Sequence, residues 1–301
     1  MRTKKIVAIL FGVMLIAFGI GLLSLKLFGF SNKVNNLGLN FSFAISDFIK
    51  NFQYNSTDYI EKNIDEEKIV SINGIKTIDI NVSFSEVNII PEKREDIRIH
   101  YHGYIKSGFI PELKTKSSNN TLFIYLEENS SISSNIQTID VRLDIYVPEK
   151  YENKVKGSTS FGNINISNMN LSKLELFTSF GNIYINNLTG EIEAETSYGN
   201  IVVNNLSGNL IASTTFGDID LKYSEFDYNI KADSSFGDIK VTLPKNSDFK
   251  IDAECSFGDI DIYFPVRITK NEKDKISGTV GSGNNIIELE TSSGDIEVIS
   301  K

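Results

Sequence analysis

Alternating apolar and polar residues recur along most of the chain, each time around an aromatic residue followed by a glycine. Before the aromatic, aliphatic or small side chains stand at every second position, as in Leu174, Leu176 and Thr178. After the glycine the phase shifts by one residue, so that Ile183 and Ile185 become the apolar positions. A period of two predicts a strand with one buried face, and the phase shift predicts a bend at the glycine.

This unit occurs six times at a nearly constant interval. Its aromatic and glycine positions are Phe161 and Gly162, Phe180 and Gly181, Tyr198 and Gly199, Phe216 and Gly217, Phe236 and Gly237, and Phe257 and Gly258. By subtraction, the glycines lie 19, 18, 18, 20 and 21 residues apart. Such a period predicts coils stacked in a solenoid, a parallel β-helix with equivalent strands paired in register. The aromatic shares the inward parity, which predicts a column of rings in the core.

The template continues past the regular run toward the C-terminus. Residues 287–298 match every column, with Gly294 at the bend and Ser293 in place of the aromatic. Ser293 follows Phe257 by 36 residues, about two periods, so residues 263–285 are expected to hold an irregular coil. The regular repeats are therefore predicted over 151–262, and the irregular and terminal coils over 263–301.

Residues 69–150 carry strands without the regular period. Strands are expected at 97–104, 121–127 and 138–148, separated by polar loops. Residues 78–89 already match the coil template, with Ser85 in place of the glycine. We therefore expect 69–150 to be an elaborated first part of the solenoid, in preference to a small β-subdomain joined to it.

The N-terminus has the pattern of a membrane anchor. Arg2, Lys4 and Lys5 precede an uncharged run over residues 6–25, which would span about 30 Å as a helix. Basic residues before the run predict a cytoplasmic N-terminus and an extracellular remainder. Residues 1–30 are thus predicted to be a basic tip and a transmembrane helix in the cell membrane. The alternative is a cleaved signal peptide, for which the run is long and lacks a cleavage site.

Residues 31–68 are predicted to be a linker. Phe41, Ile45 and Phe48 fall at spacings of three and four, which predicts a short amphipathic helix. That helix is interpreted as a cap over the first coil, with a juxtamembrane helix as the alternative. Acidic residues such as Glu66 and Glu67 then suggest a polar tether before the solenoid.

Charge narrows the set of partners. The net charge is −9, and because the first thirty residues contribute +4, the remainder carries −9 minus 4, or −13. An acidic extracellular domain argues against nucleic acid and favours cationic partners, such as cationic peptides or another envelope protein. Solubility alone also accounts for this charge, and is the simpler interpretation.

Few residues are suited to catalysis. His100 and His102 are the only histidines, and no cysteine or carboxylate cluster adjoins them in sequence, so a surface pair is favoured over a metal site. Cys255 stands in a small, inward-facing column and is interpreted as a buried substitute for Ser or Thr. The sequence therefore predicts a non-enzymatic protein that needs no cofactor.

An Asn or Asp follows each glycine of the repeat. Asp218, Asp238 and Asp259 are the acidic members, and carboxylates stacked about 4.8 Å apart in successive coils would repel unless a divalent cation lay between them. A calcium column at these three residues is therefore one interpretation. Stabilisation of the bend by local hydrogen bonds is favoured over it, because that role explains the Asn and Asp residues without a metal.

The repeats and the N-terminal segment together resemble a known family. Val70–Ile80 (Val-Ser-Ile-Asn-Gly-Ile-Lys-Thr-Ile-Asp-Ile) and the tandem Thr-Ser-x-Gly-Asx-Ile units are similar to the bacterial putative-adhesin domain family, over roughly residues 70–300. The resemblance implies a right-handed β-helix of unknown function, in proteins of the cell-envelope stress systems of Gram-positive bacteria. No catalytic residues are implied by it.

Taken together, these features predict a membrane-anchored surface protein that binds or senses a ligand or partner in envelope stress. Two alternatives remain open at this point. One is a carbohydrate-active β-helix enzyme acting on wall polysaccharide, and the other is a purely structural spacer at the cell surface.

Overall fold

Strands make up most of the part of the chain that the structure describes. The computed structural model describes residues 59–127 and 136–301, which form 21 strands in one continuous hydrogen-bonded sheet. Within those ranges no helix has the length and hydropathy needed to cross a membrane. The predicted anchor at 6–25 and the predicted amphipathic helix near Phe41 lie outside the described residues.

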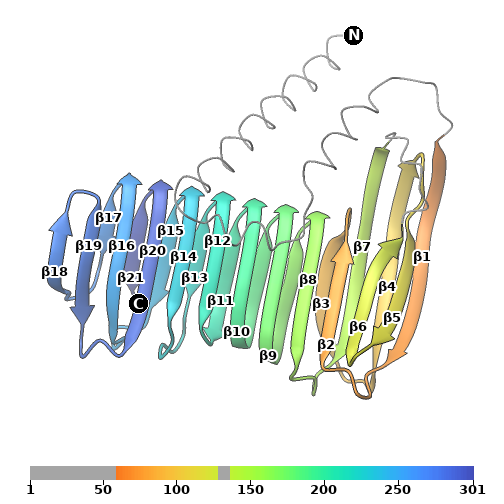
Figure 1. The fold of residues 1–301 in the computed structure, drawn as a ribbon, viewed down its shortest axis with the longest axis horizontal. Helices are drawn as coiled ribbons and strands as arrows, with labels where there is room; N and C mark the ends of the chain where they lie inside the picture. The colour runs from red at the N-terminus through yellow and green to blue at the C-terminus, as the bar shows by residue number, and fades with distance from the viewer. Residues whose placement is uncertain (1–58, 128–135) are drawn as a thin grey trace, which may run out of the picture. The chain divides into compact units, whose positions relative to one another are not determined.

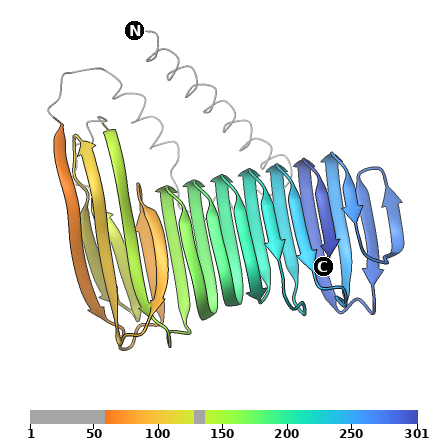
Figure 2. The same cartoon turned by 180° about the vertical axis from the view of Figure 1, so that it is seen from behind.

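The regular repeats form stacked two-strand coils, as the period predicts. Their strands are β8 (Lys154–Phe161), β9 (Ile164–Phe180), β10 (Ile183–Tyr198), β11 (Ile201–Ser207), β12 (Leu210–Phe216), β13 (Ile219–Lys222), β14 (Ile230–Phe236) and β15 (Ile239–Leu243). Equivalent strands pair in parallel with like residues opposite each other, so that Ile183 lies between Ile164 and Ile201. Figures 1 and 2 show these coils side by side in one row.

The coils enclose a core between two facing layers of strands. On β12 and β13 every second side chain is buried, and the parity changes at the intervening corner as predicted. Ile164, Ile183, Ile201 and Ile219 are fully buried in one column. Each buried aliphatic side chain contributes roughly 1.5–3 kcal/mol, so stacking supplies the apolar burial that one isolated coil lacks.

The C-terminal coils do not stack in chain order. The strands of this region are β16 (Phe249–Phe257), β17 (Ile260–Ile262), β18 (Arg267–Glu272), β19 (Lys275–Val280), β20 (Asn285–Ser293) and β21 (Ile296–Ser300). β20 pairs in parallel with β14 on one side and with β16 on the other, and β21 lies likewise between β15 and β17. The last coil is therefore inserted between two earlier ones.

The prediction of an irregular coil over 263–285 is thus wrong. This segment contains the antiparallel hairpin β18–β19, and β19 pairs antiparallel with β16 at the end of the row. The hairpin reverses the chain, which lets β20 return beside β14. A spacing of two periods gives the number of residues between two coils, but it does not fix the side on which the later coil stacks.

The N-terminal end has a matching arrangement. Its strands are β1 (Ile60–Ser71), β2 (Thr77–Val82), β3 (Glu86–Glu92), β4 (Asp96–Ser107), β5 (Glu112–Ser118), β6 (Thr121–Glu127) and β7 (Ile136–Pro148). β2 lies between β6 and β8, and β3 between β7 and β9, all in parallel. The expected elaborated first part of the solenoid is therefore what forms, and antiparallel strands β5, β4 and β1 extend its two layers.

The predicted linker ends too late in the sequence. Residues 60–68 belong to β1, which pairs along its whole length with β4. Only Ile64 of this strand is buried, so its sequence shows no alternating pattern. β1 is held mainly by backbone hydrogen bonds at the edge of the sheet, which is why its polar composition suggested a tether.

The corner after each aromatic brings backbone against backbone. A Cβ atom added to Gly181 would lie 2.0 Å from the carbonyl oxygen of Gly162, and one added to Gly199 would lie 2.0 Å from that of Gly181. No side chain can occupy that space without moving a coil. Glycine is therefore required here by the close approach of successive coils as well as by the bend.

Gly181→Ala is expected to lower the free energy of unfolding by about 3 kcal/mol, because the new methyl group meets a carbonyl that cannot rotate away. The matched control is Gly157→Ala, whose added Cβ meets side chains and no backbone, with the end of Leu176 nearest at 3.0 Å. We expect a change below about 1 kcal/mol for that variant. Urea unfolding followed by circular dichroism measures both. Equal losses in the two variants would contradict the corner constraint.

Candidate functional site

The aromatic residues of the repeat form a partly exposed ladder of stacked rings at the glycine corner. The ring ladder consists of Phe84, Phe161, Phe180, Tyr198, Phe216 and Phe236. From Phe161 to Phe236 successive ring centroids are 4.9 Å apart and the planes differ by 5–8°. The ring ladder is therefore an ordered surface feature.

The prediction that these rings lie in the core is wrong, because each of them is at least partly exposed. The exposed fraction is 47% for Phe161 and 44% for Phe236. The strand turns at the aromatic itself, so the side chain lies along the outside of the corner although its parity in the sequence is inward. Offset stacking of aromatic rings stabilises such a column without full burial.

The ring ladder is interrupted near the C-terminal end. Ser293 lies in register between Phe236 and Phe257, because the last coil is inserted there. Phe257 consequently has no stacked neighbour among the described rings, and its exposed fraction is 78%. The sequence shows that Ser293 replaces an aromatic, but it places this replacement at the end of the row.

A second ladder is formed by the Asn and Asp residues after the glycines. In spatial order this Asx ladder contains Asn163, Asn182, Asn200, Asp218, Asp238, Asp295 and Asp259. In each case the side-chain Oδ1 accepts a hydrogen bond from the backbone N–H of the next member, at 2.8–2.9 Å. The expected hydrogen bonds within a corner are thus replaced by hydrogen bonds between coils.

A third ladder lies inside the corner. Buried hydroxyl groups donate to the glycine carbonyl of the neighbouring coil, as in Thr178 to Gly162 at 3.1 Å. Cys255 takes the same place, with Sγ 3.0 Å from the Gly294 carbonyl oxygen. Burial raises the pKa of the Cys255 thiol, which disfavours the thiolate and makes the residue a poor nucleophile.

The three aspartates weighed as a calcium column are not consecutive. Asp295 lies between Asp238 and Asp259, whereas Asp218 and Asp238 are neighbours. Each Oδ1 of Asp218, Asp238 and Asp295 already accepts a backbone N–H, which stabilises the carboxylate charge. Hydrogen bonding between coils therefore accounts for the Asx ladder without a calcium ion.

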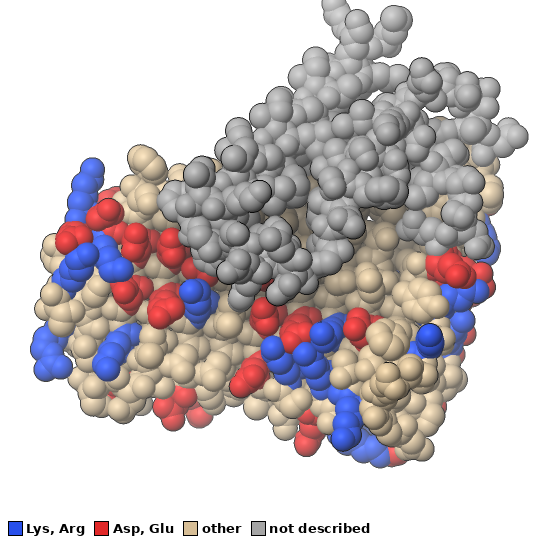
Figure 3. Space-filling model, viewed as in Figure 1, with Lys and Arg blue, Asp and Glu red and all other residues tan. Residues whose placement is uncertain are grey.

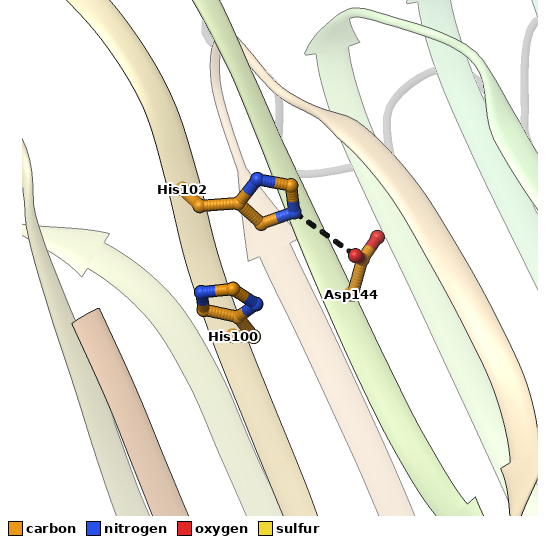
Figure 4. Close-up of side chains that lie close together, drawn as sticks. All are labelled: His100, His102 and Asp144. Atoms are coloured by element: carbon orange, nitrogen blue, oxygen red, sulfur yellow. Dashed lines mark hydrogen bonds and ion pairs between the residues drawn. The ribbon is translucent and has the colours of Figure 1, made fainter. Parts of the chain in front are cut away.

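The two histidines lie beside carboxylates that the sequence keeps far from them. His100 and His102 stack on the outer face of β4 with ring centroids 4.3 Å apart. His100 Nε2 is 2.8 Å from Asp65 Oδ1. His102 Nε2 is 2.9 Å from Asp144 Oδ2, the contact drawn in Figure 4. Strands β1 and β7 flank β4 and supply these aspartates, which explains why sequence proximity did not reveal them.

Parallel coils with glycine corners define a solenoid-like, all-β domain. A family model described as Toastrack DUF4097 matches residues 75–192 and again residues 159–299. The two overlapping matches cover well over half of the chain, so the chain belongs to this family. This confirms the resemblance to an adhesin-like domain family of unknown function drawn from the repeats.

Several solved structures are similar to the chain at low sequence identity. A "putative cell adhesion protein" from Clostridium sporogenes is 19% identical, over 80% of this chain and 100% of its own, with a TM-score of 0.34. A "putative adhesin" from Bacteroides fragilis is 17% identical, over 79% of this chain and 97% of its own, with a TM-score of 0.41. A "putative lipid binding protein" from Parabacteroides distasonis is 15% identical, over 79% and 96%, with a TM-score of 0.35. No curated protein matches the chain.

Asp238→Asn is expected to leave the free energy of unfolding within about 0.5 kcal/mol of the wild type, because the amide oxygen still accepts the Asp295 N–H, as Asn200 does for Asp218. Asp238→Ala is expected to lose about 1 kcal/mol, the contribution of that hydrogen bond. Urea unfolding with added calcium or with a chelator checks both. A calcium-dependent stabilisation that disappears in Asp238→Asn would show that the carboxylate binds a cation instead.

Proposed function

We propose that this chain is a non-enzymatic, membrane-anchored protein of the cell surface, whose right-handed solenoid binds a cationic, amphipathic partner during envelope stress. In this proposal residues 6–25 anchor the chain, the N-terminus is cytoplasmic, and the strands from Ile60 onward lie outside the cell. The basic residues before the apolar run support the orientation. Membership of an adhesin-like family supports a binding role.

The observation that carries the proposal is that two changes occur together near the C-terminal end of the row of glycine corners. The Asx ladder changes from asparagine to aspartate at Asp218 and remains acidic through Asp238, Asp295 and Asp259. The ring ladder is interrupted at Ser293 in the same stretch. Figure 3 shows acidic side chains, with several basic ones, over the strands at this end, on the left of the view.

The surface of these last coils suits a ligand that has both an aromatic ring and a positive charge. Phe236 and Phe257 are two coils apart, which corresponds to roughly 10 Å at ordinary strand spacing. One ring above Ser293 would continue the ladder with normal stacking on both sides. The exposed carboxylates of Asp238, Asp295 and Asp259 would attract a neighbouring ammonium or guanidinium group, and Phe257 offers a face to the same cation.

The test is a titration of the full chain, purified in mild detergent, with a labelled peptide rich in lysine and phenylalanine at physiological salt. We expect saturable binding that weakens about tenfold in Ser293→Phe, because an internal ring then fills the interruption. Asp295→Asn and Asp259→Asn are each expected to weaken binding about threefold, by removing an exposed charge.

The controls separate recognition from non-specific attraction. Ser293→Ala leaves the interruption open and is expected to bind like the wild type. Glu112→Gln removes a carboxylate at the opposite end of the row and is expected to have no effect. A peptide of equal charge in which alanine replaces phenylalanine should bind weakly. The proposal fails if binding disappears at physiological salt, or if both peptides bind alike.

A further inference from the structure

The outer face of β1, β4 and β7 gathers two imidazoles and two carboxylates. His100 and His102 project from the same side of β4, because they are two residues apart on one strand. Figure 4 shows both rings beside Asp144 of β7. The ligand atoms of His100, His102 and Asp144 all lie within 4.8 Å of one another. Asp65 of β1 lies on the other side of the rings, within hydrogen-bond distance of His100.

This donor set corresponds to a transition-metal site. Two neutral imidazole nitrogens with a carboxylate oxygen are ligands that Zn²⁺ and its first-row neighbours bind, whereas Ca²⁺ and Mg²⁺ prefer oxygen alone. Ligand atoms around a tetrahedral Zn²⁺ lie about 3.3 Å apart, given metal–ligand bonds of about 2.0–2.2 Å. The three ligand atoms therefore need to move by about an ångström, which rotation of partly exposed imidazole rings permits.

Neighbouring residues hold the carboxylate in place. Asp144 Oδ1 accepts a hydrogen bond from Asn88 Nδ2 at 2.7 Å, which leaves Oδ2 directed at His102. Asn88 is itself oriented, since its Oδ1 accepts a hydrogen bond from Asn165 Nδ2 at 2.8 Å. Only 16% of the Asp144 side chain is exposed. Ordered outer partners of this kind fix ligands in metal sites.

The surrounding charges permit a cation at this position. Glu67 of β1 pairs with His100 in the strand register. Together with Asp65 and Asp144 it makes the surroundings of the two rings acidic. Arg98 lies on the same face, but it stacks on Tyr146 with Cζ 3.7 Å from the ring centroid and pairs with Glu67 and Glu92. Arg142 of β7 pairs with His102 in the strand register and is exposed. Its positive charge is the one beside the rings that would repel a metal cation.

From these contacts we infer that His100, His102 and Asp144 bind a divalent first-row transition-metal ion such as Zn²⁺, while Asp65 orients the ring of His100 through its Nε2. The ion joins β4 to β7, and the contact between its ligand His100 and Asp65 links the site to the edge strand β1. Because β1 is the first strand of the described domain and has one buried side chain, the metal strengthens the attachment of that strand. This inference does not depend on the proposed peptide binding.

The experiment uses the full chain, purified in detergent without a histidine tag, treated with a chelator and then titrated with Zn²⁺ and with Co²⁺. The chain offers a clean readout, since its only histidines are these two and its one cysteine is buried. We expect one ion per chain, and for Co²⁺ the absorption bands of a four-coordinate site. His100→Gln and His102→Gln are each expected to weaken binding at least tenfold, and Asn88→Ala about tenfold.

The matched control is Asp140→Asn, which removes an exposed carboxylate from β7 near the site but not from the ligand set. It is expected to bind Zn²⁺ like the wild type. Asp65→Asn tests the contact that orients the His100 ring, and is expected to weaken binding less than the histidine variants. Zn²⁺ should also slow hydrogen exchange of the β1 amides in the wild type and not in His102→Gln. Absence of saturable binding, or binding that survives both histidine substitutions, overturns the site and leaves the histidine–aspartate contacts as hydrogen bonds only.

Discussion

The close contact between glycine backbones at the corner is the constraint on which the rest of the solenoid depends. Because a Cβ atom added to Gly181 would lie only 2.0 Å from the carbonyl oxygen of Gly162, adjacent coils meet at a distance that no other residue permits. That distance brings each hydroxyl within reach of the neighbouring glycine carbonyl, and each Asx side chain within reach of the next backbone N–H. The same distance sets the 4.9 Å spacing of the rings.

Stacking in register also places like charges above one another, which normally destabilises a sheet. In the Asx ladder the cost is offset because Asp218, Asp238 and Asp295 each accept a backbone hydrogen bond from the next coil. On the strands, lysines near an acidic side chain offset part of this cost, and Lys154, Lys156 and Lys173 all pair with Glu175. These lysines lower the pKa of Glu175 to about 2, although burial acts in the opposite direction.

The sequence predicts the repeated part of this fold well because residues close together in the chain determine the structure of each coil. Period-two alternation, a phase change at glycine and a constant interval define the coil, its corner and the parallel pairing. The order of the terminal coils is different in kind, since β20 carries the same template as its neighbours and its insertion beside β14 depends on the hairpin that precedes it. Likewise, β1 has only Ile64 in the core, so no pattern distinguishes it from a polar linker. The contacts of His100 and His102 depend on the pairing of β1, β4 and β7, which sequence spacing does not encode.

A solenoid of this kind satisfies its polar groups from one coil to the next, and this determines where binding can arise. Inside the regular run, hydroxyl, amide and carboxylate groups serve the neighbouring coil: Thr196 donates to the Gly181 carbonyl, and Asn182 accepts from the Asn200 N–H. New chemistry therefore requires a position where the repetition stops. The inserted terminal coil creates one such position, because Ser293 removes one ring from a continuous ladder. The antiparallel strands at the opposite end create another, because β1, β4 and β7 bring together side chains that no coil repeats. Both proposed sites thus follow from how the chain closes the two ends of its own stack.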